Sequence, residues 1–148
     1  MYDPSKSLLR VACVGDSRAI LGRWNDETGK YDVKLLSTDQ TGFNIAERER
    51  IEAAHPGESK IIDKDSGRLL GIAVTRAFGD VRWKWTQEQV LQTKEKFWGS
   101  PLRPNYETPP YMTAEPVVTE TEIKRGKKGD FVIMASDGIW DQISSAHA

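Results

Sequence analysis

Phe131-Val132-Ile133-Met134-Ala135-Ser136-Asp137-Gly138-Ile139-Trp140-Asp141 runs without a break from an apolar stretch into the start of a helix. Residues 131–136 are mostly large and apolar, so they predict a strand. Asp137 follows at the strand end, where a rigid frame would hold its carboxylate toward a cleft. The adjacent Gly138 would let backbone or ligand come close. Asp137 is therefore a candidate ligand for a cation.

A second aspartate stands beside another predicted strand. Residues 8–14 and 19–24 both have the composition of strands. Gly15 and Asp16 lie between them, so we expect a hairpin with Asp16 at its tip. Carboxylates in such places suit hard cations such as Mg²⁺ or Mn²⁺. The alternative for both Asp16 and Asp137 is a plain turn aspartate that bonds the local backbone.

The remaining pattern alternates short strands with separate helices. Asn44 and Glu47 predict a capping box at the start of a helix that ends near Ala54, and Thr86 and Gln89 predict a second capping box. Because most strands are joined by turns, the fold class is α+β with largely antiparallel sheets. We also expect strands at 33–36 and 117–123 and short apolar runs at 60–62 and 69–74. The second helix should end at Gly99 and carry Val90, Lys94, Phe97 and Trp98 on one face. Residues 100–110 should form a proline-rich surface insertion, and residues 124–130 a glycine-rich turn.

Length and composition limit the class of protein. The chain has 148 residues, of which 38% are hydrophobic and 29% charged, and this suits one globular domain. A net charge of -1 gives no basic field for nucleic acid. The single cysteine, Cys13, excludes an internal disulfide and is expected to be inert core. No stretch approaches the ~20 apolar residues of a membrane span, and residues 1–10 lack the pattern of a secretory signal or transit peptide.

Five segments, taken in their order along the chain, can be compared with the motifs of known families. They are Val14-Gly15-Asp16-Ser17-Arg18-Ala19, Leu36-Ser37-Thr38-Asp39-Gln40, Glu47 to Ile51, Leu69 to Asp80, and Phe131 to Asp141. In this order they resemble the metal-dependent, type 2C serine/threonine protein phosphatase family, with Gln40 in place of the family's histidine. The resemblance implies that residues 1–148 are a partial type 2C domain. It also implies a partial four-layer α-β-β-α sandwich, in which two sheets pack together and helices cover their outer faces.

Three further segments resemble the pyruvate dehydrogenase phosphatases within that family. These segments are residues 52–58, 76–85 and 108–116. Related mitochondrial-type phosphatases of fungi or plants are the competing interpretation. The resemblance implies a phosphoprotein substrate, with a mitochondrial dehydrogenase complex as the expected one. It also implies residence in the mitochondrial matrix; without the subfamily resemblance, the expectation is cytoplasmic.

The family resemblance also implies a mechanism. Two metal ions activate a water that attacks the phosphorus of a phosphoserine or phosphothreonine, without a phosphoenzyme. Asp137 matches the family's late metal-binding aspartate, and Asp16 matches the aspartate that helps to hold a third, weaker metal. The implied cofactors are therefore Mg²⁺ or Mn²⁺, as two or three ions in the complete domain. No catalytic residue is expected beyond these metal ligands.

The sequence departs from the family in ways that matter. The early Glu-Asp pair, the Asp-Gly-His-Gly segment, the late Asp-Asn pair and the early phosphate-binding arginine have no match. One core carboxylate cannot hold two divalent ions tightly. We therefore expect a fragment of a longer product, with an open sheet edge and an uncovered apolar face, that alone binds metal weakly and hydrolyses little. The alternative is a truncated isoform or pseudophosphatase that binds a phosphoprotein without turnover.

Other conspicuous residues have structural interpretations. We expect Arg76 and Asp80 to brace their local turn, and His55 to be a helix-end residue rather than a ligand. Trp83 and Trp85 alternate and could form a docking surface, but packing in the core is favoured. A basic cluster is expected to be a solvated hairpin loop rather than a phosphate site. Its members are Lys124, Arg125, Lys127 and Lys128.

Overall fold

The chain forms two compact units in the computed structural model, which describes residues 1–124 and 128–148. Unit 1 comprises Met1–Asp39 and Pro116–Ala148, and unit 2 comprises Gln40–Glu115. Each unit has its own apolar core. Within the described residues, none of the helices has the length and hydropathy that a bilayer span requires.

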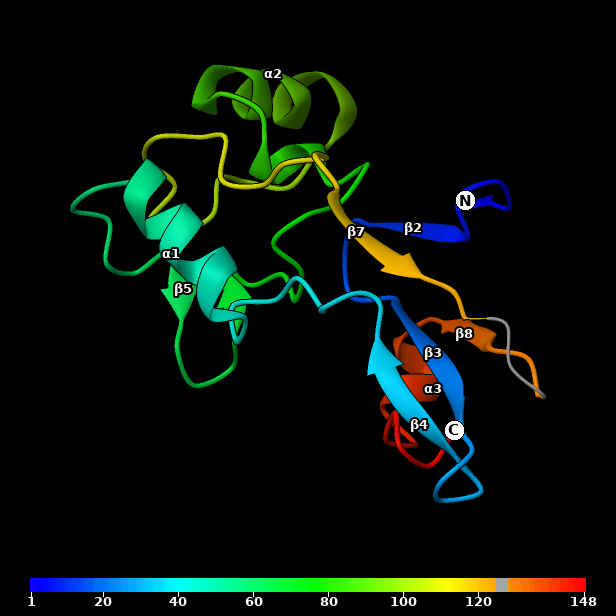
Figure 1. The fold of residues 1–148 in the computed structure, drawn as a ribbon. Helices are drawn as coiled ribbons and strands as arrows, with labels where there is room; N and C mark the ends of the chain where they lie inside the picture. Colours follow the sequence, from blue (N-terminus) through cyan, green and yellow to red (C-terminus); the bar gives the residue numbers. More distant parts are fainter. Residues whose placement is uncertain (125–127) are drawn as a thin grey trace. The chain divides into compact units, whose positions relative to one another are not determined.

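Unit 1 contains two three-stranded antiparallel sheets (Figure 1). The first sheet has the order β1 (Tyr2–Asp3), β2 (Leu8–Cys13) and β7 (Val117–Glu122). The second has the order β4 (Lys30–Leu35), β3 (Arg18–Asn25) and β8 (Phe131–Ala135), and the short helix α3 (Asp137–Trp140) follows β8. The predicted α+β class with antiparallel sheets is therefore confirmed.

The predicted hairpin around Asp16 is wrong. Strands β2 and β3 follow each other along the chain, yet they belong to different sheets. The same holds for β7 and β8, so the expected hairpin loop at 124–130 is wrong as well. Gly15 has φ 106, a left-handed conformation that a glycine adopts without strain. This freedom lets the chain leave one sheet and enter the next.

The core of unit 1 lies between its two sheets. Ala19, Leu21 and Leu36 are buried there. Leu9, Val11 and Ile123, from the first sheet and the residue after it, pack against them. Because side chains alternate along a strand, Ala19 and Leu21 point to the same face of β3. This packing of sheet on sheet supplies the two inner layers of the expected sandwich.

Other apolar side chains of unit 1 are exposed, as expected for a sheet face that the chain leaves uncovered. Leu35 at the end of β4 is 54% exposed, Val118 in β7 is 55% exposed, and Met134 in β8 is 75% exposed. Cys13 is buried, which confirms that prediction.

Unit 2 is built from helices and a small antiparallel ribbon. Its elements are α1 (Ile45–Ala54), β5 (Ile62–Asp63), β6 (Arg68–Leu69), the 3-10 helix η1 (Val81–Trp83) and α2 (Gln87–Phe97). Trp83 belongs to the core, as predicted, and its indole Nε1 donates to the carbonyl of Leu69 at 3.1 Å. The buried core residues are Ile51, Ile61, Ile62, Leu69, Leu70, Trp83, Tyr106, Tyr111 and Met112.

The start of α1 differs from its prediction. The side chain of Asn44 caps the helix by accepting from the Ala46 N–H at 3.1 Å. The backbone N–H of Asn44, however, donates to the carbonyl of Thr41, so no capping box with Glu47 forms. His55 ends the helix as its C-cap, which confirms its expected place.

Glu47 is buried and forms the polar centre of unit 2. Its carboxylate accepts from Arg76 Nε at 2.9 Å and Nη2 at 2.5 Å, from Arg50 Nη2 at 2.9 Å and from Thr75 Oγ1 at 2.7 Å. Arg76 also donates to the carbonyl of Glu115 at 2.7 Å. Arg76 was expected to brace its local turn with Asp80, and it also reaches acceptors that lie 29 and 39 residues away.

Helix α2 confirms its predicted capping box but not its predicted apolar face. Thr86 and Gln89 exchange the two expected hydrogen bonds. Val90 is buried, whereas Phe97 is 75% exposed and Trp98 is 96% exposed. Trp98 is the C-cap with φ 58, and this left-handed conformation turns its side chain away from the helical face.

Residues 100–110 are irregular, as predicted for an insertion, but they do not lie wholly on the surface. Tyr106 is buried, and its hydroxyl donates to the carbonyl of Trp85 at 2.5 Å. The proline-rich composition of the segment did not predict that its aromatic residue, Tyr106, belongs to the core.

The Glu47 cluster predicts a large effect of one substitution on stability. Glu47→Gln removes the negative charge that faces the buried Arg76 guanidinium, so it should lower the free energy of unfolding by about 3 kcal/mol. Urea unfolding followed by tryptophan fluorescence measures this, because Trp83 lies in the same core. The matched control is Glu49→Gln, at an exposed position of α1. Equal urea midpoints for Glu47→Gln and Glu49→Gln would contradict a stabilising role of the Glu47 carboxylate.

The same cluster predicts a pH dependence. Burial alone would raise the pKa of Glu47, but hydrogen bonds from Arg76, Arg50 and Thr75 outweigh it and lower the pKa from 4.5 to about 2. The stabilising contribution is therefore fully present above pH 4.5, amounts to about 3 kcal/mol, and is lost as pH falls toward 2. Unfolding free energies measured across this window should fall less steeply in Glu47→Gln than in the parent chain. If the free energy of unfolding has the same pH dependence in both chains, Glu47 is not the group that causes the loss of stability at low pH.

Candidate metal site

Two aspartates of unit 1 lie at the same end of the second sheet. Strands β3 and β8 pair antiparallel with Arg18 opposite Ala135. Asp16 lies two residues before Arg18, and Asp137 lies two residues after Ala135. In an antiparallel pair, the residues that precede one strand lie at the same end of the sheet as the residues that follow its partner. The register therefore brings together two residues that are far apart in the sequence.

Hydrogen bonds hold helix α3 in place beside this edge. The indole Nε1 of Trp140 donates to the carbonyl of Ala135 at 2.9 Å and to the carbonyl of Arg18 at 3.1 Å. The Arg18 guanidinium lies over the Trp140 ring, 5.4 Å from its centroid. Asp137, the first residue of α3, is thus fixed relative to the start of β3.

The electrostatics of Asp16 indicate a gathering of carboxylates. Partial burial raises the pKa of the Asp16 carboxyl most, and a hydrogen bond from its own backbone N–H lowers it. The negative charges of Asp137, Asp39 and Asp141 raise the pKa further. Each of these charges therefore acts on Asp16 through space, as like charges do when they share a site.

Asp39 has a positively charged partner in the same unit. Arg18 donates to its carboxylate through Nε at 2.9 Å and Nη2 at 2.5 Å. This bidentate pair raises the pKa of Arg18, chiefly through the hydrogen bond. Arg18 thus connects the carboxylate after β4 to the beginning of β3.

Asp16 and Asp137, the predicted ligands, come to one edge, and their role in metal binding stays a prediction. Asp39 and Asp141 were not predicted as members of this cluster, although both lie in segments that carry the resemblance. Asp39 follows the end of β4 by four residues and Asp141 is the C-cap of α3, so their place near the ends of these elements was the available signal. Within residues 1–124 and 128–148, no group of three or more His, Cys, Asp or Glu side chains has a geometry that could hold a metal ion.

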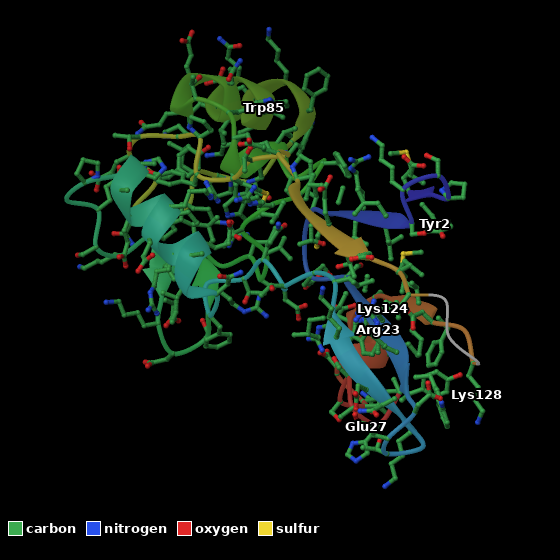
Figure 2. All side chains as sticks on the ribbon, in the orientation of Figure 1. Tyr2, Arg23, Glu27, Trp85, Lys124 and Lys128 are labelled. Carbon is green, nitrogen blue, oxygen red and sulfur yellow. The ribbon has the colours of Figure 1, made fainter. Side chains whose placement is uncertain are left out.

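The predicted basic cluster is described only at Lys124 and Lys128. Arg125 and Lys127 lie outside the described residues. Figure 2 shows Arg23 and Lys124 close together, and both contact Asp130: the Arg23 guanidinium at 3.2 Å and the Lys124 backbone N–H at 3.3 Å. Lys128 Nζ lies 3.8 Å from the centroid of the Trp24 ring.

Comparisons with known proteins agree with one another. A family profile described as "Protein phosphatase 2C" matches residues 1–148. A protein phosphatase 2C homolog of Schizosaccharomyces pombe is 44% identical in a match of 149 aligned positions, which covers 99% of this chain and 32% of the relative. The protein named pyruvate dehydrogenase (acetyl-transferring) phosphatase 1, mitochondrial, of Saccharomyces cerevisiae is 40% identical in a match of 152 aligned positions, which covers 98% of this chain and 26% of the relative.

Among solved structures, the crystal structure of a phosphatase from Toxoplasma gondii matches with a TM-score of 0.55 at 22% identity. The match covers 95% of this chain and 32% of that one, and at this identity it supports the fold alone. The chain spans about a quarter to a third of the length of these two relatives and of this structure.

The carboxylate cluster predicts a measurable coupling. Asp137→Asn removes one of the negative charges that act on Asp16, so the pKa of the Asp16 carboxyl should fall. Carboxyl-detected NMR titration of the labelled chain measures that pKa directly. Asp26→Asn is the matched control, because Asp26 follows the far end of β3. An Asp16 pKa that is the same in both variants would mean that the two carboxylates do not share an edge.

Proposed function

Because the chain belongs to the protein phosphatase 2C family, we propose that it forms part of a domain that hydrolyses phosphoserine and phosphothreonine in proteins with the help of Mg²⁺ or Mn²⁺. The observation that carries the proposal is the carboxylate cluster at one edge of the second sheet, where the charges of Asp137, Asp39 and Asp141 act on Asp16. Residues 1–148 would be a partial domain, with the other metal ligands on segments outside it.

Asp137 and Asp16 would hold the cations. Partial burial, and after it the negative charges of the neighbouring aspartates, raise the pKa of Asp16, and a divalent cation would offset the repulsion among these charges. Mg²⁺ is usually bound through one or two carboxylates, while waters and substrate phosphate complete its octahedral set. When bound, such ions lower the pKa of a water and neutralise charge on the phosphoryl group. Two or three ions would be present in the complete domain.

Neighbouring residues of this chain would orient the ligands rather than take part in the reaction. The bidentate bond of Arg18 to Asp39 and the bonds of Trp140 to Arg18 and Ala135 fix the edge on which Asp137 stands. Rigid placement matters because phosphoryl transfer depends on alignment of the attacking water with the phosphorus.

The substrate class follows from similarity to relatives. The S. cerevisiae relative is named for pyruvate dehydrogenase and for mitochondria. We propose a phosphoprotein substrate in a mitochondrial dehydrogenase complex, and residence in the mitochondrial matrix. Segments 52–58, 76–85 and 108–116, which resemble the pyruvate dehydrogenase phosphatases, support this choice over other members of the family.

A second candidate is a catalytically inactive form that binds a phosphoprotein without turnover. One observation favours keeping it: the described residues contain no group of three or more His, Cys, Asp or Glu side chains that could hold a metal ion.

A chimaera separates the two candidates. This chain is exchanged for the matching segment of the S. pombe relative, which then supplies the remaining segments of the domain. If residues 1–148 are catalytic, the purified chimaera should hydrolyse a phosphothreonine peptide in Mn²⁺, and Asp137→Asn should lower kcat by about a hundredfold or more. Asp16→Asn should have a smaller effect, as expected for a weaker metal.

Two further arms complete the experiment. The exchange with Asp26→Asn serves as control and should keep activity. The chain alone should turn over far below the roughly 10 per second of a median enzyme. A folded chimaera that binds the peptide without hydrolysing it would contradict the catalytic proposal and favour the binding module. Turnover at the usual enzymatic rate by the chain alone would contradict the partial site.

A further inference from the structure

Unit 2 contains a pocket of about 260 Å³ that is surrounded by positive charge. Three of its lining residues are Lys60, Arg68 and Arg103. We propose that this pocket binds the phosphate group of a small phosphate monoester. The proposal is independent of the carboxylate cluster, whose residues all belong to unit 1.

The positive charges of the pocket are not neutralised within the described part of the chain. None of Lys60, Arg68 and Arg103 has an ion-pair partner among the described residues. Asp63 is the acidic residue that lines the pocket, but its oxygens accept from the Ser66 hydroxyl at 2.8 Å and from the Asp65 N–H at 2.9 Å. The pocket therefore has three positive side chains and one carboxylate, and that carboxylate is already bonded within its own turn. The excess positive charge suits a ligand with two negative charges.

Arg103 is the most fixed of the three cations. Its guanidinium lies over the Trp83 ring, 4.9 Å from the centroid. It also lies close to Gly71, where an added Cβ would be 3.0 Å from Nη1, and φ is +89. The Arg103 guanidinium is therefore held between an aromatic ring and the backbone. Its side chain has little conformational entropy left to lose when a ligand binds.

Arg103 also has a donor without an acceptor. Its Nε is buried and makes no hydrogen bond among the described residues. A buried unpaired donor costs about 1–3 kcal/mol, more for a charged group. An anion in the pocket would give the guanidinium charge-assisted acceptors, and Arg is the side chain that binds phosphate through such paired bonds.

A second guanidinium adds to the positive potential. Arg82 lies over the same Trp83 ring, 5.7 Å from the centroid, and donates to the carbonyl of Pro101 at 2.5 Å. Burial lowers the pKa of Arg82, and the positive charge of Arg103 lowers it further. Two guanidinium groups thus repel each other next to the pocket, and a bound anion would reduce that repulsion.

The size of the pocket limits the ligand. Typical sites for drug-sized molecules measure about 300–1,000 Å³, so this pocket suits a phosphate group with a short carbon chain rather than a nucleotide. Ile61 and Leu70 provide apolar wall for such a chain, and Asn105 provides an amide at the border. A phosphate monoester such as phosphoserine has both parts.

The test uses the full chain, labelled with nitrogen-15, in a buffer of low ionic strength. Inorganic phosphate and free phosphoserine are the probes, and the backbone amide resonances of the lining residues Gly71 and Asn105, which every variant retains, are the readout. Both probes should shift these resonances in a saturable way. Arg103→Gln should weaken binding about tenfold or more, because charge-assisted bonds to a guanidinium are lost. Arg68→Gln and Lys60→Gln should each weaken binding about two- to fivefold.

The controls make the result decisive. Lys64→Gln removes an exposed charge from the same turn and should leave binding within about twofold of the parent. If Arg103→Gln unfolds unit 2, the other two variants carry the test. Wild-type affinity in both of them, or an equal shift produced by chloride at matched ionic strength, would overturn the proposal. Absence of any shift with both probes would overturn it too.

A last arm identifies the source of the phosphate. If a phosphoserine peptide binds more tightly than free phosphoserine, the site receives a phosphoprotein. If free phosphoserine binds as tightly or more tightly, the site receives a small molecule.

Discussion

The antiparallel register of β3 and β8 is the constraint on which the candidate site depends. With Arg18 opposite Ala135, the turn that contains Gly15 and Asp16 leaves the sheet at the edge where α3 begins. A shift of one residue would move every side chain of β8 to the opposite face and would separate the carboxylates. The hydrogen bonds from the Trp140 indole to the carbonyls of Arg18 and Ala135 oppose such a shift, because they join the helix after β8 to the start of β3. The bonds of one buried indole therefore help to fix the position of the charged side chains.

Much of the secondary structure could be predicted from sequence, whereas the pairing of strands could not. Apolar alternation located β2, β3, β7 and β8 to within one or two residues. The prediction of strand partners failed because adjacency along the chain favours hairpins, whereas β2 pairs with β7 and β3 with β8 across more than a hundred residues. The site shows the same division. Asp16 and Asp137 could be chosen from strand-end patterns and family resemblance, but Asp39 and Asp141 join them only through tertiary structure.

Unit 2 shows why local patterns mislead when a charge is buried. Asn44 and Glu47 have the spacing of a capping box, yet Glu47 bonds Arg76, Arg50 and Thr75 instead. A buried carboxylate needs several charge-assisted partners, and a helix N-terminus offers fewer of them than two guanidinium groups. The phosphate pocket was equally hidden, because Lys60, Arg68 and Arg103 are separated along the chain and meet only when the core around Trp83 forms.

The central claim is that Asp16 and Asp137 line one cation site on a shared sheet edge. Titration of the nitrogen-15-labelled chain with Mn²⁺ tests it most directly, because the paramagnetic ion broadens resonances of nuclei close to it. The backbone resonances of residues 15–17 and 137–141 are expected to broaden together, at the lowest Mn²⁺ concentrations. Broadening of one group while the other stays sharp would contradict it.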